Sequence, residues 1–186
     1  GPIVQDEELL ASEEVCYVGQ PVALVIGTSP EIARRGVKMI TVDIEQLPAI
    51  TDPKEAFSKG KTIGSPRTFI LGDAEATWQK CDHVLEGSCD IGGQEHVYLE
   101  TQRARAIPLE ENNLCIYSAT QGPSAVQRHA AKVLGLPAHN IEVDVKRLGG
   151  GFGGKEDQAT PWACMAALAA WHTKKPVELV LGRADD

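Results

Sequence analysis

The residues best suited to chemistry form a glycine loop at residues 149–156, with the sequence GGGFGGKE. A predicted strand at 141–145 precedes the glycine loop, and a predicted helix at 159–171 follows it. Glycine adopts backbone angles closed to other residues and lets the main chain approach a ligand closely. Bare N–H groups that open onto a helix N-terminus attract anions. We interpret the loop as a ligand-binding element, because an ordinary turn needs only one or two glycines.

Two nucleotide-binding patterns partly match this loop. Residues 149–155 fit G-x-x-x-x-G-K, but Glu156 follows where a triphosphate-binding loop needs Ser or Thr to hold magnesium. Three of the glycines also fit G-x-G-x-x-G, the dinucleotide-binding pattern, with residues 177–181 as the second strand. The ribose-binding acid expected after that strand is missing until Asp185. A dinucleotide-binding oxidoreductase module therefore stays open as an alternative function.

Four other segments occur in a fixed order along the chain: 17–23 (YVGQPVA), 43–49 (DIEQLPA), 92–101 (GGQEHVYLET) and 118–123 (SATQGP). Together with the glycine loop, this series resembles the motifs of the molybdenum hydroxylases, the family of xanthine dehydrogenase and aldehyde oxidase. The resemblance extends over nearly the whole chain, and five motifs in family order make chance agreement improbable.

The resemblance implies an α+β internal fragment of a molybdopterin-binding subunit. Residues 1–59 would be the C-terminal part of an a/b hammerhead-type domain, and 73–186 the N-terminal part of the molybdopterin-binding domain. Residues 60–72 would link them; the neighbouring stretch 58–67 is rich in Lys, Arg and Gly and poor in apolar residues, as linkers are.

The resemblance also assigns roles to single residues. Gly151, Phe152 and Gly153 would bind the molybdopterin through main-chain amides and a ring edge. Gln121 would donate its side-chain N–H to an oxo ligand of molybdenum, without coordinating the metal directly. Glu156 would act at the substrate, because xanthine-type enzymes of the family have a glutamate at this place and aldehyde-type enzymes generally do not. A carboxylate accepts hydrogen bonds from the N–H groups of a purine, which small aldehydes lack.

The implied reaction is hydroxylation of a purine-like N-heterocycle, xanthine or hypoxanthine, with water as the oxygen source. An aldehyde oxidase-type substrate is the alternative. The family's general base lies in a C-terminal part outside this sequence, so the fragment alone is expected to be inactive. Iron–sulfur clusters and FAD are expected in other domains or subunits of the parent. Lys155 is expected to be a surface or outer-layer cation, and the resemblance gives Gln94 and Glu100 no role.

Composition excludes several other classes. The formal net charge of −8 argues against a nucleic-acid surface, and no apolar run approaches the roughly 18 residues of a membrane span. Five cysteines without a C-x-x-C pair predict free thiols in a reducing compartment, hence a cytoplasmic protein, and exclude an iron–sulfur cluster here. The histidines show no metal-binding spacing.

Local patterns predict the secondary structure. Apolar, β-branched or alternating runs favour strands at 21–26, 40–44, 84–91, 103–108, 114–118, 141–145 and 177–181. Capping signals favour helices at 30–39, from 52, at 73–80, from 123 to 134 and at 159–171. The alanine-rich last helix is expected to pack closely against its neighbours.

Overall fold

The computed structural model describes residues 6–186, which divide into two compact units. The first unit combines the chain up to Ile40 with Gln94–Asp186, and the second is Thr41–Gly93. The domain boundary predicted at residues 60–72 stays a prediction.

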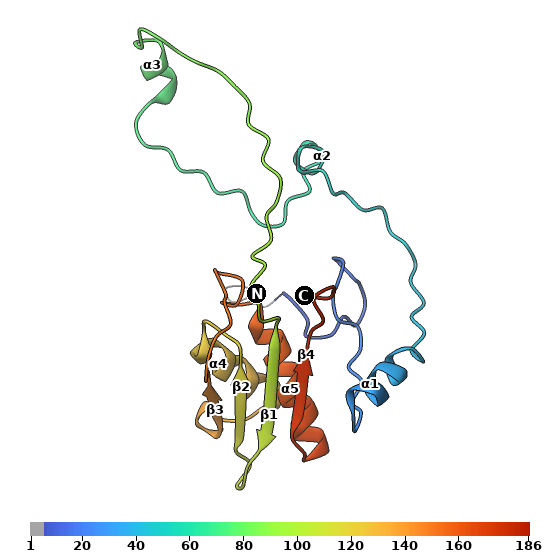
Figure 1. Ribbon diagram of the computed structural model, residues 1–186. Coiled ribbons are helices and arrows are strands. Elements are labelled where there is room, and N and C mark those ends of the chain that lie inside the picture. The colour runs from blue at the N-terminus through green and yellow to red at the C-terminus, as the bar shows by residue number, and fades with distance from the viewer. Residues whose placement is uncertain (1–5) are drawn as a thin grey trace. The chain divides into compact units, whose positions relative to one another are not determined.

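The first unit is built on a four-stranded mixed sheet in the order β3-β2-β1-β4 (Figure 1). Its strands are β1 (Arg103–Pro108), β2 (Leu114–Ser118), β3 (Ile141–Asp144) and β4 (Val177–Val180). Strand β1 runs antiparallel to both β2 and β4, whereas β2 and β3 are parallel. The carboxyl ends of β2 and β3 therefore lie at the same edge of the sheet.

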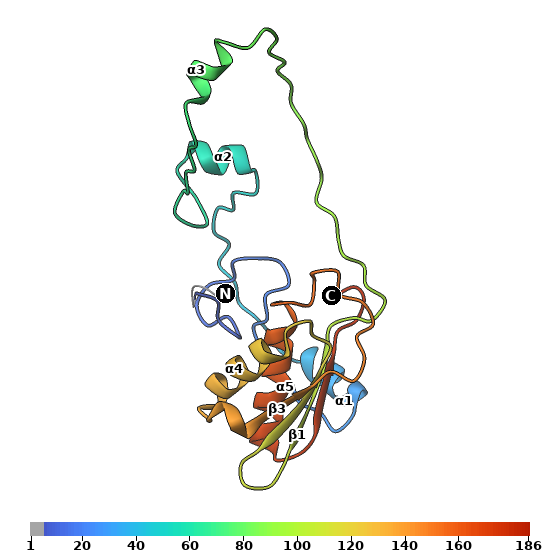
Figure 2. The same ribbon diagram turned by 90° about the vertical axis from the view of Figure 1, so that its left-hand side faces the viewer.

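Two helices, α4 (Pro123–Leu134) and α5 (Ala159–Thr173), cover one face of this sheet (Figures 1 and 2). Helix α4 begins with a proline, whose fixed φ suits the first turn, and ends at Gly135 with φ +67°. Helix α5 ends at Lys174, also in the left-handed region. A 3-10 turn, η1 (Ala138–Asn140), leads into β3.

The core lies between these helices and the sheet. Alternate strand residues point into it, among them Ala106 and Ile116, which pair across β1 and β2. The small side chains of α5 let its backbone approach the sheet, and those in the core are Ala163, Cys164, Ala166, Ala167 and Ala170. The predicted elements of this region are confirmed, with β3 and β4 each one residue shorter and α5 slightly longer than expected.

Three shorter helices confirm the capping signals. Helices α1 (Pro30–Val37) and α2 (Pro53–Ser58) each start with a proline after a capping residue: Ser29 accepts from the Ile32 N–H at 3.3 Å, and Asp52 from the Glu55 N–H at 2.7 Å. Asp73 caps α3 (Ala74–Trp78) in the same way.

The strands predicted at 21–26, 40–44 and 84–91 are wrong, because none of these segments forms a strand. A strand depends on hydrogen bonds to a neighbouring strand. No such ladder joins these three segments to another strand within residues 6–186. The fold is therefore mixed α/β in the sheet region, while the expected strands of the α+β first piece are absent.

Within residues 6–186, no helix has both the length and the apolar character needed to cross a membrane. All five cysteine thiols are free.

Candidate functional site

The site forms where the segment after β2 meets the glycine loop after β3. The Gln121 N–H donates to the Lys155 carbonyl at 2.8 Å, and the Thr120 hydroxyl donates to the same oxygen at 3.2 Å. The Gly122 N–H in turn donates to the Thr120 hydroxyl at 2.9 Å. These bonds join two segments that are distant in sequence at the carboxyl ends of parallel strands, where ligands of α/β proteins commonly bind.

The side chain of Gln121 is oriented by the glycine loop. Its Oε1 accepts the N–H groups of Gly153 at 3.1 Å and Lys155 at 3.2 Å. Its Nε2 donates to no other residue within 6–186. The carbonyl end is thus occupied, and the NH₂ end is available as a donor to a ligand.

The glycine loop needs its glycines for two separate reasons. A Cβ atom on Gly151 would overlap the Gln121 side-chain amide, and one on Gly154 would lie 2.8 Å from the Tyr98 ring. Gly150 and Gly153 have φ values of +95° and +93°, which side chains disfavour.

Main-chain donors remain open in this loop. The N–H groups of Gly150, Gly151 and Phe152 have no acceptor in the part of the chain that the structure describes, although Gly151 is buried. Buried N–H groups are nearly always paired. Open amides beside the free Nε2 of Gln121 would therefore suit a ligand rich in hydrogen-bond acceptors, which a pterin cofactor would be.

Two predicted site residues are exposed beside these donors. Phe152 has φ +52°, a left-handed conformation uncommon for an aromatic residue, and its exposed fraction is 75%. The Glu156 side chain is exposed, and none of residues 6–186 makes a hydrogen bond to it. Its backbone carbonyl lies close to Gly122, where a Cβ atom would come within 3.2 Å. The structure thus brings Gln121, Gly151, Phe152, Gly153 and Glu156 together around one loop.

Of the two places expected for Lys155, the surface is excluded, because its exposed fraction is 0%; an outer-layer position behind the loop stays a prediction. Its Nζ donates to the Glu100 carbonyl at 2.6 Å, lies 3.4 Å from Glu100 Oε2, and stands 4.4 Å from the centre of the Tyr98 ring. Glu100 Oε2 also accepts the Gly149 N–H at 2.8 Å. Glu100, to which the sequence assigned no role, therefore contacts both Gly149 and Lys155.

A polar network extends this contact beneath the loop. Gln102 Nε2 donates to the Tyr98 hydroxyl at 3.0 Å and to the Gly154 carbonyl at 2.9 Å. The Tyr98 hydroxyl donates to Asp186 at 3.2 Å, and Arg183 donates to the Tyr98 carbonyl at 2.6 Å. Burial, assisted by the Asp186 carboxylate, raises the pKa of Tyr98 above its ordinary 10.0, so the phenol stays protonated at neutral pH.

Sequence reasoning missed this network because its members lie far apart in the chain. The only available signal was that Tyr98 and Glu100 fall in one family-like segment and Lys155 in another. Spacing carries no sign of a contact between residues separated by 55 positions, as Glu100 and Lys155 are.

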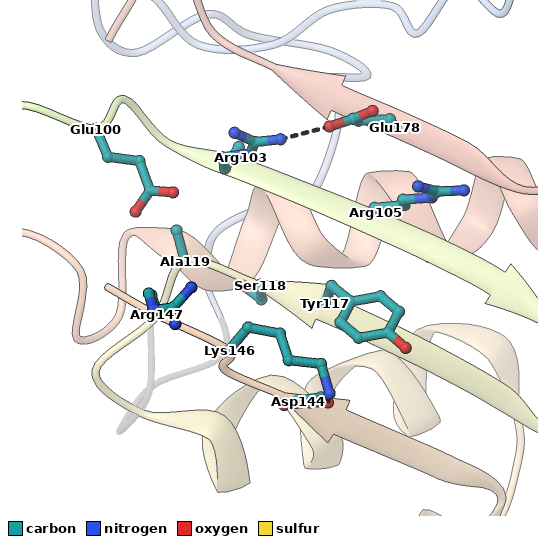
Figure 3. Close-up of a pocket in the computed structure, with 10 residues that line it drawn as sticks. All are labelled: Glu100, Arg103, Arg105, Tyr117, Ser118, Ala119, Asp144, Lys146, Arg147 and Glu178. Carbon is teal, nitrogen blue, oxygen red and sulfur yellow. Dashed lines mark hydrogen bonds and ion pairs between the residues drawn. The ribbon is translucent and has the colours of Figure 1, made fainter. Parts of the chain in front are cut away.

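A separate hollow of about 330 Å³ opens on the face of the sheet that the helices leave uncovered (Figure 3). Arg103 pairs there with Glu178 at 2.6 Å, and Lys146 pairs with Asp144. None of Gln121, Phe152 or Glu156 lines the hollow, and Glu100 alone is common to both places. Most of the charged side chains that line the hollow form ion pairs within the protein. The hollow is therefore a different place from the candidate site.

No cluster of His, Cys, Asp and Glu that could hold a metal ion occurs within residues 6–186. The site therefore offers hydrogen-bond donors to a ligand, and no group of metal-ligating side chains. The dinucleotide alternative also fails on topology. It requires neighbouring parallel strands on either side of the loop and helix, whereas β3 and β4 lie at opposite edges of the sheet.

Comparison with known proteins identifies the family of this chain. The model of the molybdopterin cofactor-binding domain matches residues 57–186. Xanthine dehydrogenase of Dictyostelium discoideum is 37% identical over 188 residues, which is 100% of this chain and 14% of that protein. Probable aldehyde oxidase gad-3 of Caenorhabditis elegans is 39% identical over 97% of this chain and 15% of its own length.

A solved structure gives the same fold. Quinoline 2-oxidoreductase from Pseudomonas putida 86 superposes with a TM-score of 0.79 at 27% identity, over 98% of this chain and 25% of that chain. The chain thus spans only a small share of the proteins it resembles. It belongs to the molybdenum hydroxylase family, and its residues 57–186 match the molybdopterin cofactor-binding domain.

Proposed function

We propose that this chain forms one wall of the active site of a xanthine dehydrogenase-like molybdenum hydroxylase. The parent protein would hydroxylate a purine-like N-heterocycle, xanthine or hypoxanthine, with water as the oxygen source. The observation that carries this proposal is the exposed Glu156 carboxylate, which directly follows the loop residue hydrogen-bonded to Gln121.

The cofactor-binding residues follow from the open donors. Gly151 and Phe152 offer main-chain N–H groups, and the left-handed turn at Phe152 presents its ring outward. The Gly153 N–H, also predicted to bind the cofactor, donates instead to Gln121 Oε1, so Gly153 would serve the cofactor by orienting Gln121. Gln121 offers Nε2 to an oxygen ligand of the molybdenum while its Oε1 stays bound to the loop. Bound molybdopterin would supply the two-electron oxidation, and these residues orient it.

Glu156 would select the substrate. Its carboxylate is an acceptor only, so it favours a ring that carries N–H groups. Since no residue within 6–186 hydrogen-bonds to this side chain, its acceptor capacity is available to a ligand.

The remaining features of the parent are also proposals. Residues 1–59 would belong to an a/b hammerhead-type domain and 60–72 to a linker, in a cytoplasmic enzyme. Iron–sulfur clusters and FAD belong to other domains of such proteins. The isolated chain would be inactive, because it supplies only some of the walls that hold the cofactor. Its contacts would be too few to offset the entropy lost when a ligand is ordered.

The Glu156→Ala variant of the full-length parent tests the substrate assignment. Hydrogen bonds to a charged group are worth about 1.5–3 kcal/mol, so kcat/KM for a purine should fall by about ten- to a hundredfold. Turnover of a small aldehyde should change little. The measurement is the ratio of the two kcat/KM values, with Glu142→Ala on the exposed edge of β3 as the control.

A second candidate is an aldehyde oxidase-type substrate, which the 39% identity to probable aldehyde oxidase gad-3 supports. An unchanged ratio of purine to aldehyde kcat/KM in Glu156→Ala would favour this candidate. Glu156 would then stabilise the segment before α5 and would not contact the substrate.

A further inference from the structure

We propose that Lys155 is a positioning residue of the molybdopterin site, which holds the glycine loop and, through it, the Gln121 side chain. The inference rests on the proposed function for its catalytic consequence. Its structural basis is the contact of Lys155 with Glu100 and Tyr98, named here the lysine clamp.

The lysine clamp begins with a fully buried ammonium group. Removing a charge from water is costly unless it is paired and hydrogen-bonded. Lys155 Nζ has the Glu100 carbonyl at 2.6 Å, the Glu100 carboxylate at 3.4 Å and the face of the Tyr98 ring at 4.4 Å. These contacts offset the free energy lost when the ammonium group leaves water only while the lysine keeps this one position. The clamp therefore fixes the backbone at residue 155.

One carboxylate oxygen then ties the start of the glycine loop to its end. Glu100 Oε2 accepts the Gly149 N–H at 2.8 Å and pairs with Lys155 Nζ. The Glu100 N–H also donates to the Gly149 carbonyl at 3.1 Å. The span between Gly149 and Lys155 is thereby held from beneath, although glycine-rich segments are otherwise free to adopt many conformations.

The main chain of Lys155 passes this constraint to Gln121. Its N–H donates to Gln121 Oε1 at 3.2 Å, and its carbonyl accepts the Gln121 N–H at 2.8 Å. If residue 155 moved, Gln121 would lose the bonds that turn its Nε2 away from the loop. The lysine Nζ is directed at Glu100 and Tyr98, so its effect on the site would pass through the main chain to Gln121.

The test uses Lys155→Met in the full-length holoenzyme. Methionine fills a similar volume without the charge. Loss of a group that orients a metal-site residue typically costs ten- to a hundredfold in activity. We expect kcat to fall by about that factor, with KM within about twofold, because substrate contacts remain. The electron paramagnetic resonance signal of the partly reduced molybdenum should also change. The matched control is Lys146→Met, which removes a lysine ion-paired at the surface.

Hydrogen exchange gives a readout that does not depend on the cofactor. Peptides covering the glycine loop should exchange faster in Lys155→Met than in Lys146→Met. Exchange at the wild-type rate would overturn the clamp, even in an enzyme that contains molybdenum and oxidises purines. Absence of molybdenum from the wild-type parent would instead refute the proposed function and leave the exchange result to decide the clamp.

Glu100→Gln keeps the test decisive if Lys155→Met fails to fold. The amide retains an acceptor oxygen and removes the charge, so a smaller loss of kcat in the same direction is expected. Where Lys155→Met folds, the double variant should be no worse than Lys155→Met, because both changes remove the same ion pair between Lys155 Nζ and Glu100 Oε2. Wild-type kcat in Glu100→Gln, or additive losses in the double variant, would contradict the proposal.

Discussion

Residues 94–186 and residues 41–93 of this chain contrast in how much structure their sequences produce. Every buried residue within 6–186 lies between Tyr98 and Ala170, in the first region. The second region has two short helices and no buried residue. Both regions contain apolar and β-branched runs from which strands were predicted, so hydrophobic pattern does not explain the difference.

The presence of partners explains it. Strand β1 is hydrogen-bonded on both sides, by β2 and β4, and its alanines pack against α5. Residues 84–91 have no neighbouring strand in the part of the chain described, and Leu85 among them is 96% exposed. The propensity of a strand thus reflects packing and pairing more than an intrinsic preference of the backbone.

Hydrogen exchange of the 186-residue chain should show the largest contrast between the two regions. Amides of β1 and α5 open only with the core, whereas local opening in 41–93 costs almost nothing. We expect protection factors to differ by on the order of a thousandfold or more. Equal protection in peptides of 84–91 and 103–108, measured by mass spectrometry, would remove the contrast.

Cysteine labelling compares the same regions chemically. Burial raises the pKa of the Cys164 thiol from 9.0 to about 12, so its reactive thiolate is about a thousandfold rarer near neutral pH. Cys81 and Cys89 are exposed. Thiol titration should therefore label Cys81 and Cys89 quickly and Cys164 only after unfolding, with denatured protein as the control.

The same shift sets a pH dependence. Because the folded state raises the pKa of Cys164, this thiol stabilises the fold fully below pH 9.0 and loses its contribution as pH rises toward about 12. A midpoint of denaturation that did not fall across this window, relative to Cys164→Ala, would argue against the buried neutral thiol.

Truncating one isoleucine in each region tests the core directly. Ile116 has an exposed fraction of 0%, so Ile116→Ala should lower the free energy of unfolding by about 3 kcal/mol. Ile63 is fully exposed, and Ile63→Ala should change it by less than about 0.5 kcal/mol. Denaturant titration of the chain measures both. Similar losses would show that residues 41–93 share in a core.

A glycine pair gives the smallest and most local effect. In Gly151→Ala the new methyl group would push the Gln121 amide off the loop, and we expect the parent to lose about tenfold to a hundredfold in kcat. Gly64 has open space around it, so Gly64→Ala should leave kcat unchanged. Activity and molybdenum content of the full-length parent check both. A wild-type kcat in Gly151→Ala would contradict the idea that the glycine loop positions Gln121 for catalysis.

The sequence by itself determined the helices and pointed to part of the candidate site. Capping at Ser29, Asp52 and Asp73 depends on residues three positions apart, so it could be recognised locally. The glycine loop, Gln121 and Glu156 were identifiable because their residue types suit a ligand and match a family order.

Only the tertiary structure decided which predicted strands form and what holds the loop. Strand formation at 103–108 and its absence at 84–91 depend on hydrogen-bonding partners distant in the chain. The burial of Lys155 depends on Glu100, 55 positions earlier. Long-range pairing of this kind leaves no periodic trace in the sequence, since the free energy that selects it arises only when the segments meet.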